Sequence, residues 1–172
     1  MNKGNIIRIG LGLGALFLGS LEYIISRPAD SSHIGRIVSE FAGNLLFRID
    51  VFGFLGGFLP DFIHPFSFAL LTMALFPAGA RKVRGIICLF WLVIDIIFEI
   101  GQFFDQQIAE FMAKLFSHNS AANILANYFT KGTYDHLDIL AICLGITAAF
   151  IIGEFTVNLT PNKKHSRETE IY

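Results

Sequence analysis

Four long apolar runs, separated by shorter polar segments, dominate the 172-residue chain. They cover approximately residues 6–26, 62–79, 83–104 and 137–157. Each is close to the length of about 20 residues, at about 1.5 Å per residue, that crosses a hydrocarbon core. Because lipid offers no partner to backbone N–H and C=O groups, each run is expected to be a helix. The pattern predicts an all-α polytopic membrane protein, with a single domain at 1–160 built as a bundle of four transmembrane helices and a polar cytoplasmic tail at 161–172.

The composition agrees with a membrane location. Hydrophobic residues make up 53% of the chain and charged residues only 16%, which leaves more apolar surface than a soluble domain of this size can bury. The net charge of −1 and the lack of a basic stripe interleaved with aromatic residues exclude nucleic acid as a partner. Cys88 and Cys143 lie within apolar runs and without metal-type spacing, so both are expected to be buried thiols.

Basic residues predict the orientation of the bundle. They open the first run, fill the short turn between the second and third runs, and follow the fourth: Lys3, Arg8, Arg81, Lys82, Arg84, Lys163, Lys164 and Arg167. By the positive-inside rule, the N-terminus, that turn and the C-terminal tail are cytoplasmic. The expected location is the plasma or bacterial inner membrane, crossed several times.

The two connections on the outer side are expected to contain amphipathic helices. Apolar residues recur at helical spacing within 34–45 and again within 108–115, with polar residues between them. This pattern is typical of helices that lie in the membrane interface. The Gly-rich stretch 51–60 is too short to span, and residues 34–58 are consistent either with a place in the interface or with a re-entrant segment.

Small residues indicate where the helices approach one another closely. Gly10, Gly14 and Gly19 of the first run do not have the spacing of a phosphate-binding loop, and they are interpreted as packing positions. On the fourth run, Gly145 and the neighbouring alanines have the same interpretation.

The third apolar run carries a stripe of polar residues. Asp95, Glu99, Gln102 and Gln106 fall within an arc of about 60° on one face of a helix. An Asp at a helix centre costs about 2.5–3.5 kcal/mol on insertion scales, while each large aliphatic residue or Phe contributes about 0.3–0.6 kcal/mol in favour of insertion. The run still inserts, but its carboxylates must face protein or water rather than acyl chains.

Three runs deliver polar groups to the same outer face of the predicted bundle. We expect one cluster there, with Asp95 deeper than the rest, made of Asp61, His64, Asp95, Glu99, Gln102, Asp135 and Asp138. For the three aspartates at helix starts, simple capping is an alternative interpretation. Pro65 is expected in the first turn of the second helix, where its missing N–H does no harm.

These residues resemble the VanZ-like family of small polytopic bacterial membrane proteins. In that family an Asp-Lys-x-x-His-x-x-x-Tyr signature opens one span, Glu-x-x-Gln closes the next, and an Asp with a Gly seven residues later opens the last. The matching positions here are Asp61, His64, Glu99, Gln102, Asp138 and Gly145. Phe62 stands at the position of the Lys, and Phe68 at that of the Tyr. The resemblance implies a cell-envelope protein and no defined reaction.

Three functions are consistent with the cluster. The first is binding of a lipid head group or a lipid-linked precursor at the outer leaflet, in which Glu99 and Asp138 accept hydrogen bonds and His64 donates to phosphate. The second is a membrane-embedded enzyme acting on lipid substrates, either by acid/base chemistry or through a metal held by His64, Glu99, Asp135 and Asp138. The third is a structural or assembly role based on interhelical hydrogen bonds. Membrane lipids are the expected partners, no cofactor is assigned, and the oligomeric state stays open.

Overall fold

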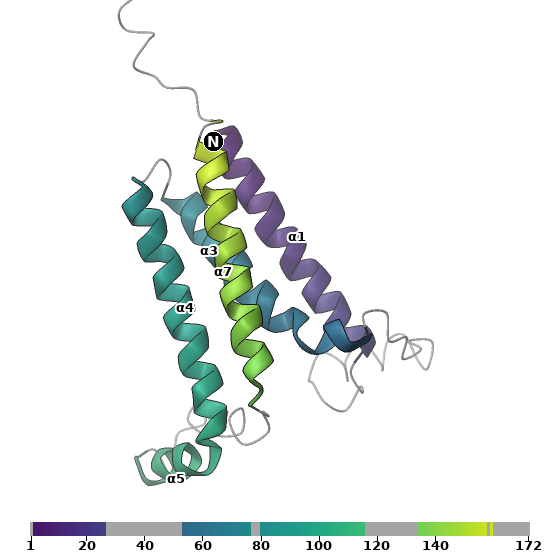
Figure 1. The fold of residues 1–172 in the computed structure, drawn as a ribbon, viewed down its shortest axis with the longest axis vertical. Coiled ribbons are helices and arrows are strands. Elements are labelled where there is room, and N and C mark those ends of the chain that lie inside the picture. The colour runs from purple at the N-terminus through teal and green to yellow at the C-terminus, as the bar shows by residue number, and fades with distance from the viewer. Residues whose placement is uncertain (1, 27–52, 77–79, 116–133, 158, 160–172) are drawn as a thin grey trace, which may run out of the picture.

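The computed structural model describes residues 2–26, 53–76, 80–115, 134–157 and 159 of the chain. In order along the chain, its elements are α1 (Lys3–Ser26), the 3₁₀ helix η3 (Gly53–Gly57), α3 (Leu59–Leu75), α4 (Arg81–Phe103), α5 (Asp105–Leu115) and α7 (His136–Val157). The described part is all-helical and contains no strand, as the apolar pattern predicts (Figure 1).

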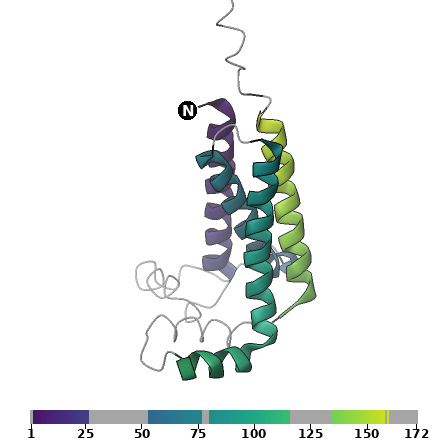
Figure 2. The ribbon, with the colours of Figure 1, turned by 90° about the vertical axis from the view of Figure 1, so that its left-hand side faces the viewer.

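Helix α3 occupies the centre of the bundle. α1, α4 and α7 all pack against it, and Figure 2 shows these three helices side by side. The core is formed by the buried side chains of α3 together with those of α4 and α7: Phe66, Ala69, Leu70, Met73, Ile87, Cys88, Ile146 and Ala149. Because α3 faces a helix on several sides, its apolar residues are buried almost all round.

Glycines allow the closest helix contacts. A Cβ atom at Gly145 of α7 would collide with the backbone carbonyl of Phe62 in α3, and one at Gly19 of α1 would meet Ile63 at 3.1 Å. The interpretation of Gly19 and Gly145 as packing positions is therefore confirmed. For Gly10 and Gly14 it is wrong within the described part of the chain, where an added Cβ at either position meets nothing within 4 Å. They lie on a different face of α1 from Gly19.

Each of the four predicted runs coincides with a long helix, with small shifts at the ends. α3 starts at Leu59, so Pro60 occupies its first turn and Pro65 lies inside the helix, where it is buried. The prediction for Pro65 is wrong because the helix begins three residues earlier than the apolar run. Inside the helix, Pro65 supplies no N–H to the carbonyl four residues before it.

Within the described residues, two helices are long and apolar enough to cross a membrane, namely the α1 segment Lys3–Glu22 and α7. α3 is apolar but has 17 residues, about 26 Å of helix. α4 has 23 residues and carries five charged ones, Arg81, Lys82, Arg84, Asp95 and Glu99. Length and composition alone thus identify α1 and α7 as candidate spans. Whether α3 and α4 are also spans depends on how their polar side chains are arranged.

The two connections predicted to lie on the outer side are described in part. α5 occupies the second predicted amphipathic segment and runs crosswise to the long helices (Figures 1 and 2). In the stretch 51–60, η3 leads directly into α3, and Gly53 has a positive φ of 51° that favours glycine. The first predicted amphipathic segment, 34–45, and the tail at 161–172 lie outside the described residues.

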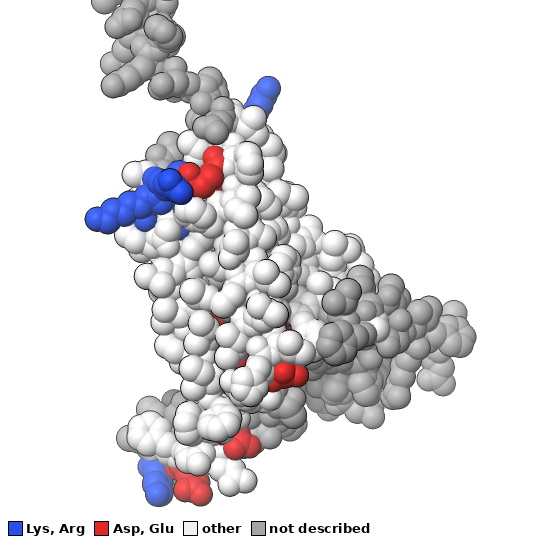
Figure 3. All heavy atoms as spheres, viewed as in Figure 1, with Lys and Arg blue, Asp and Glu red and all other residues white. Residues whose placement is uncertain are grey.

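Basic side chains gather at one end of the bundle. Figure 3 shows Lys and Arg near the start of α4 and the N-terminus, beside an acidic group, with further Asp and Glu toward the other end, where α5 carries both signs. The acidic group at the basic end is Glu154, which pairs with Arg81 and Arg84. The acidic residues of the predicted cluster therefore lie at the end opposite the basic turn.

Candidate functional site

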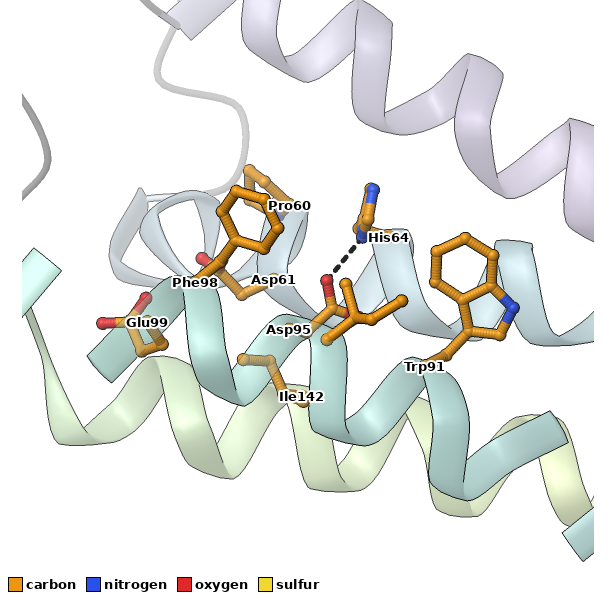
Figure 4. Close-up of a pocket in the computed structure, with 9 residues that line it drawn as sticks. Pro60, Asp61, His64, Trp91, Asp95, Phe98, Glu99 and Ile142 are labelled. Carbon is orange, nitrogen blue, oxygen red and sulfur yellow. Dashed lines mark hydrogen bonds and ion pairs between the residues drawn. The ribbon is translucent and has the colours of Figure 1, made fainter. Parts of the chain in front are cut away.

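A cavity of about 470 Å³ lies between α3 and α4, with α7 behind it. We call this cavity the polar pocket, and Figure 4 shows its walls. Its lining comprises polar residues on one side and apolar residues around them: Pro60, Asp61, His64, Trp91, Ile94, Asp95, Phe98, Glu99 and Ile142. Four of the seven residues predicted as a cluster line this pocket, namely Asp61, His64, Asp95 and Glu99.

His64 and Asp95 link the two walls. The Nδ1 atom of His64 lies 2.7 Å from Oδ1 of Asp95 (Figure 4). The His64 side chain is 49% exposed and that of Asp95 only 11%. The second oxygen of Asp95, Oδ2, is buried and has no hydrogen-bond partner among the described residues. A buried carboxylate thus fixes the orientation of a half-exposed imidazole, whose Nε2 is left for another partner.

An aromatic group supports His64 on its other side. The His64 ring lies 4.5 Å from that of Phe68, which stacks on Trp91 at 4.9 Å between ring centroids. The Trp91 indole N–H donates to the hydroxyl of Thr72 at 3.0 Å. Because that N–H is satisfied within the protein, Trp91 presents an apolar face to the pocket. The sequence analysis missed Trp91, although its place one turn before Asp95 is a usable signal.

Glu99 is almost completely buried, with 3% of the residue exposed. Its Oε1 accepts the backbone N–H of Asp135 at 3.1 Å, and its Oε2 accepts Gln102 Nε2 at 3.4 Å. The first bond ties α4 to the residue just before α7. Glu99 therefore faces protein, as the insertion argument requires for a carboxylate in this helix.

The remaining predicted residues surround Glu99 without lining the pocket. The Asp135 carboxylate accepts the backbone N–H of Leu137 at 2.9 Å, so it caps the start of α7. Asp138 is close enough to Asp61, Asp135 and Glu99 for their charges to interact. The structure brings all seven residues to one region, but Asp135 contributes its backbone to Glu99 and uses its side chain for capping.

No group of three or more His, Cys, Asp or Glu side chains in the described segments is placed to share a metal ion. The metal ligand set considered from the sequence, His64, Glu99, Asp135 and Asp138, therefore does not converge. His64 pairs with Asp95, and Asp135 with the backbone of α7.

A second polar network lies at the basic end of the bundle. Arg8 is 3% exposed and donates from Nε to Thr156 Oγ1 at 2.7 Å, and from its two terminal nitrogens to the carbonyls of Met73 at 3.3 Å and Gly153 at 3.0 Å. The Met73 carbonyl lies in the last turn of α3, where carbonyls lack intrahelical partners, and the Gly153 carbonyl lies just before the last turn of α7. The sequence analysis treats Arg8 only as a flanking positive charge, and this is wrong.

Arg84 is also turned inward. It is buried and binds Glu154 of α7 at 2.7–2.8 Å, while the exposed Arg81 reaches the same carboxylate at 3.8 Å. A basic turn at a helix start can point outward or inward, and the sequence does not distinguish these arrangements.

Comparison of the chain with protein-family models, with curated proteins and with solved structures finds no match.

Proposed function

We propose that α1, α3, α4 and α7 form a membrane-embedded bundle whose polar pocket binds the head group of a lipid or of a lipid-linked envelope precursor. The proposal includes membership of the VanZ-like family, because the residues that carry the resemblance gather around one pocket. The observation that carries the function is the polar pocket itself, which has acidic and imidazole groups on its inner wall and aromatic and aliphatic groups around them.

The distribution of polarity supports a four-helix membrane bundle. Charged side chains are buried in the interior, namely Arg8, Glu22, Arg84, Asp95 and Glu99. Large apolar side chains of all four helices are more than half exposed, among them Phe17, Leu18, Leu75, Phe76, Leu89, Phe90, Ile97 and Phe155. In water this arrangement would be costly, whereas in lipid it satisfies both sets of groups. The charges of α4 are therefore compatible with a span, because Arg84, Asp95 and Glu99 face protein and the exposed Arg81 and Lys82 lie at the start of the helix.

Exposed basic residues support the proposed orientation. Lys3, Arg81 and Lys82 are exposed and lie at the end of the bundle that contains the N-terminus and the C-terminal end of α7. By the positive-inside rule that end is cytoplasmic. Glu99 lies four residues from the end of α4, about 6 Å along the helix. The polar pocket then opens near the outer head-group region of a plasma or inner membrane.

The shape of the polar pocket suits an amphiphile. Phe98, Ile94 and Trp91 line it from near the outer end of α4 inward, over seven residues or about 10 Å. Acyl chains can lie along this apolar side while Asp61, His64 and Glu99 contact the polar head. Small-molecule sites in proteins commonly combine an apolar lining with a few oriented polar groups in this way.

A pocket-narrowing substitution tests the proposal. Ile94 lines the pocket and its neighbour Val93 is exposed on the outside, so Ile94→Trp and Val93→Trp place a Trp at adjacent positions with opposite environments. Native mass spectrometry of the purified protein during stepwise delipidation should show a lipid that the wild type and Val93→Trp retain and Ile94→Trp loses. Equal retention by all three proteins would contradict a lipid site in the pocket.

The His64–Asp95 pair favours one second candidate, an acid/base enzyme acting on a bound lipid. A carboxylate that orients an imidazole toward a cavity is the arrangement of a general base. The two candidates differ in what happens to the lipid. An enzyme releases or changes the head group on incubation and loses this conversion in His64→Ala, whereas a binding protein returns the lipid unchanged.

A further inference from the structure

The charges of the polar pocket restrict the head group that it can accept. Three carboxylates line the pocket, from Asp61, Asp95 and Glu99, with Asp138 close behind them. No Lys or Arg is among the lining residues of the described chain, and the only cationic group available there is the His64 imidazole. An anionic head group would therefore meet more negative than positive charge.

Apart from His64, and from the Trp91 N–H that already donates to Thr72, the described lining residues offer no side-chain hydrogen-bond donor. Ionised carboxylates only accept hydrogen bonds, and the buried Oδ2 of Asp95 has no donor among the described residues. A buried acceptor without a donor is costly, so this atom indicates a ligand that brings N–H groups. A divalent cation would be an alternative source of positive charge, but no three acidic, His or Cys side chains in the described segments converge on one point.

Building on the proposed lipid-binding function, we infer that the polar pocket takes a zwitterionic head group that carries both a phosphate and a primary ammonium group. The ammonium group lies between Asp95 and Glu99, where it supplies the donor that Asp95 Oδ2 lacks and offsets the negative charge of Glu99. The phosphate lies against His64, whose Nδ1 is held by Asp95 and whose Nε2 donates when the ring is protonated. The ammonium group then meets carboxylates, and the phosphate meets the imidazole, which is the one lining side chain of the described chain that can become cationic.

Two related lipid classes fit less well. A head group with phosphate or pyrophosphate and no amine places its negative charge beside three carboxylates. A quaternary ammonium head group has the right charge but no N–H, so Asp95 Oδ2 stays without a donor. The inference therefore separates three lipids that differ only at the head: phosphatidylethanolamine, phosphatidylcholine and phosphatidylglycerol.

The experiment measures which lipid is retained from an equimolar mixture of these three, with matched acyl chains, by native mass spectrometry of the full chain. Phosphatidylethanolamine should be enriched about tenfold over each of the others, the factor that one charge-assisted hydrogen bond of about 1.4 kcal/mol supplies. Asp95→Asn and Glu99→Gln should each abolish this enrichment. Both replacements keep the shape of the side chain and an oxygen that can accept the existing bonds from His64 and Asp135. Glu110→Gln, on the exposed side of α5, should leave it unchanged.

Different failures have different meanings. Preferential retention of phosphatidylglycerol, equal retention of phosphatidylcholine, or enrichment that survives both pocket variants would overturn the amine inference. Each of these leaves the lipid site intact as long as Ile94→Trp still releases the lipid. Glycerophosphoethanolamine, which has the head group without acyl chains, should compete only at far higher concentration, and equal potency would assign the pocket to soluble amines instead.

Discussion

The imidazole of His64 on α3 and the carboxylate of Asp95 on α4 are in contact at 2.7 Å, and they close the polar pocket from two sides. Asp95 is buried in a helix whose outer surface is apolar. Within the described residues, His64 is the only hydrogen-bond partner of the Asp95 carboxylate. This bond therefore offsets part of the cost of burying the carboxylate in the helix. The contact joins the stability of the bundle to the chemistry of the pocket.

Removal of His64 should reveal this coupling. A hydrogen bond to a charged group contributes about 1.5–3 kcal/mol, so His64→Ala is expected to lower the free energy of unfolding in detergent by about 2 kcal/mol. The double variant His64→Ala/Asp95→Ala should cost less than the sum of the two single changes, because it removes the unpaired carboxylate as well. His136→Ala, at an exposed position on α7, is the control and should change stability by less than about 0.5 kcal/mol. Strict additivity of the two pocket substitutions would contradict the contact.

The close approach of α3 and α7 predicts that Gly145 tolerates no larger residue. In Gly145→Ala the new methyl group collides with the carbonyl of Phe62, and overpacking of this kind typically costs about 1–3 kcal/mol. Thermal unfolding in detergent should show the loss. Gly14→Ala is the matched control, since its methyl group meets nothing within 4 Å and Ala is the better helix former. If Gly145→Ala were as stable as Gly14→Ala, α3 and α7 would not approach each other as closely as described.

Arg8 should be essential for the basic end of the bundle. Its guanidinium bonds to Thr156 and to two backbone carbonyls, so Arg8→Met leaves buried acceptors unsatisfied and should lower the free energy of unfolding by about 2–4 kcal/mol. Lys3→Met removes an exposed positive charge from the same helix and should have little effect on unfolding. Comparable losses in the two variants would show that Arg8 acts as a flanking charge only.

The orientation of the bundle can be tested with single cysteines. In a background with Cys88→Ala and Cys143→Ala, Lys82→Cys and Glu110→Cys place thiols at exposed positions near opposite ends of α4. A membrane-impermeant maleimide added to intact cells should label Glu110→Cys, and it should label Lys82→Cys only after the cells are opened. Labelling of both thiols from the same side would exclude α4 as a span.

The sequence predicts the helices and the polar region well for identifiable reasons. Each apolar run is long enough to predict a helix. The polar residues at the ends of three runs are predicted to meet, because an apolar surrounding would not accept them singly. Asp61, His64, Asp95 and Glu99 are accordingly predicted together and line one pocket. Gln102 is also correctly placed beside Glu99.

Other features depend on the rotation of each helix about its own axis. A sequence that is apolar on all faces of a helix does not reveal this rotation. Gly12 and Gly19 face α3 while Gly10 and Gly14 do not, although all four lie in the same apolar run. The inward turn of Arg8 depends on carbonyls at the ends of α3 and α7 that come close only in the folded bundle. The capping role of Asp135 similarly depends on where α7 begins.

The most direct test of a lipid in the polar pocket uses the one tryptophan of the chain. Trp91 lines the pocket, so a lipid with brominated acyl chains should quench its fluorescence when bound there. In a titration of the delipidated protein in detergent, a lipid site in the pocket should give quenching that saturates at about one lipid per chain. Quenching that rises in proportion to the mole fraction of brominated lipid, without saturation, would show that Trp91 meets only bulk lipid and would contradict the pocket as a binding site.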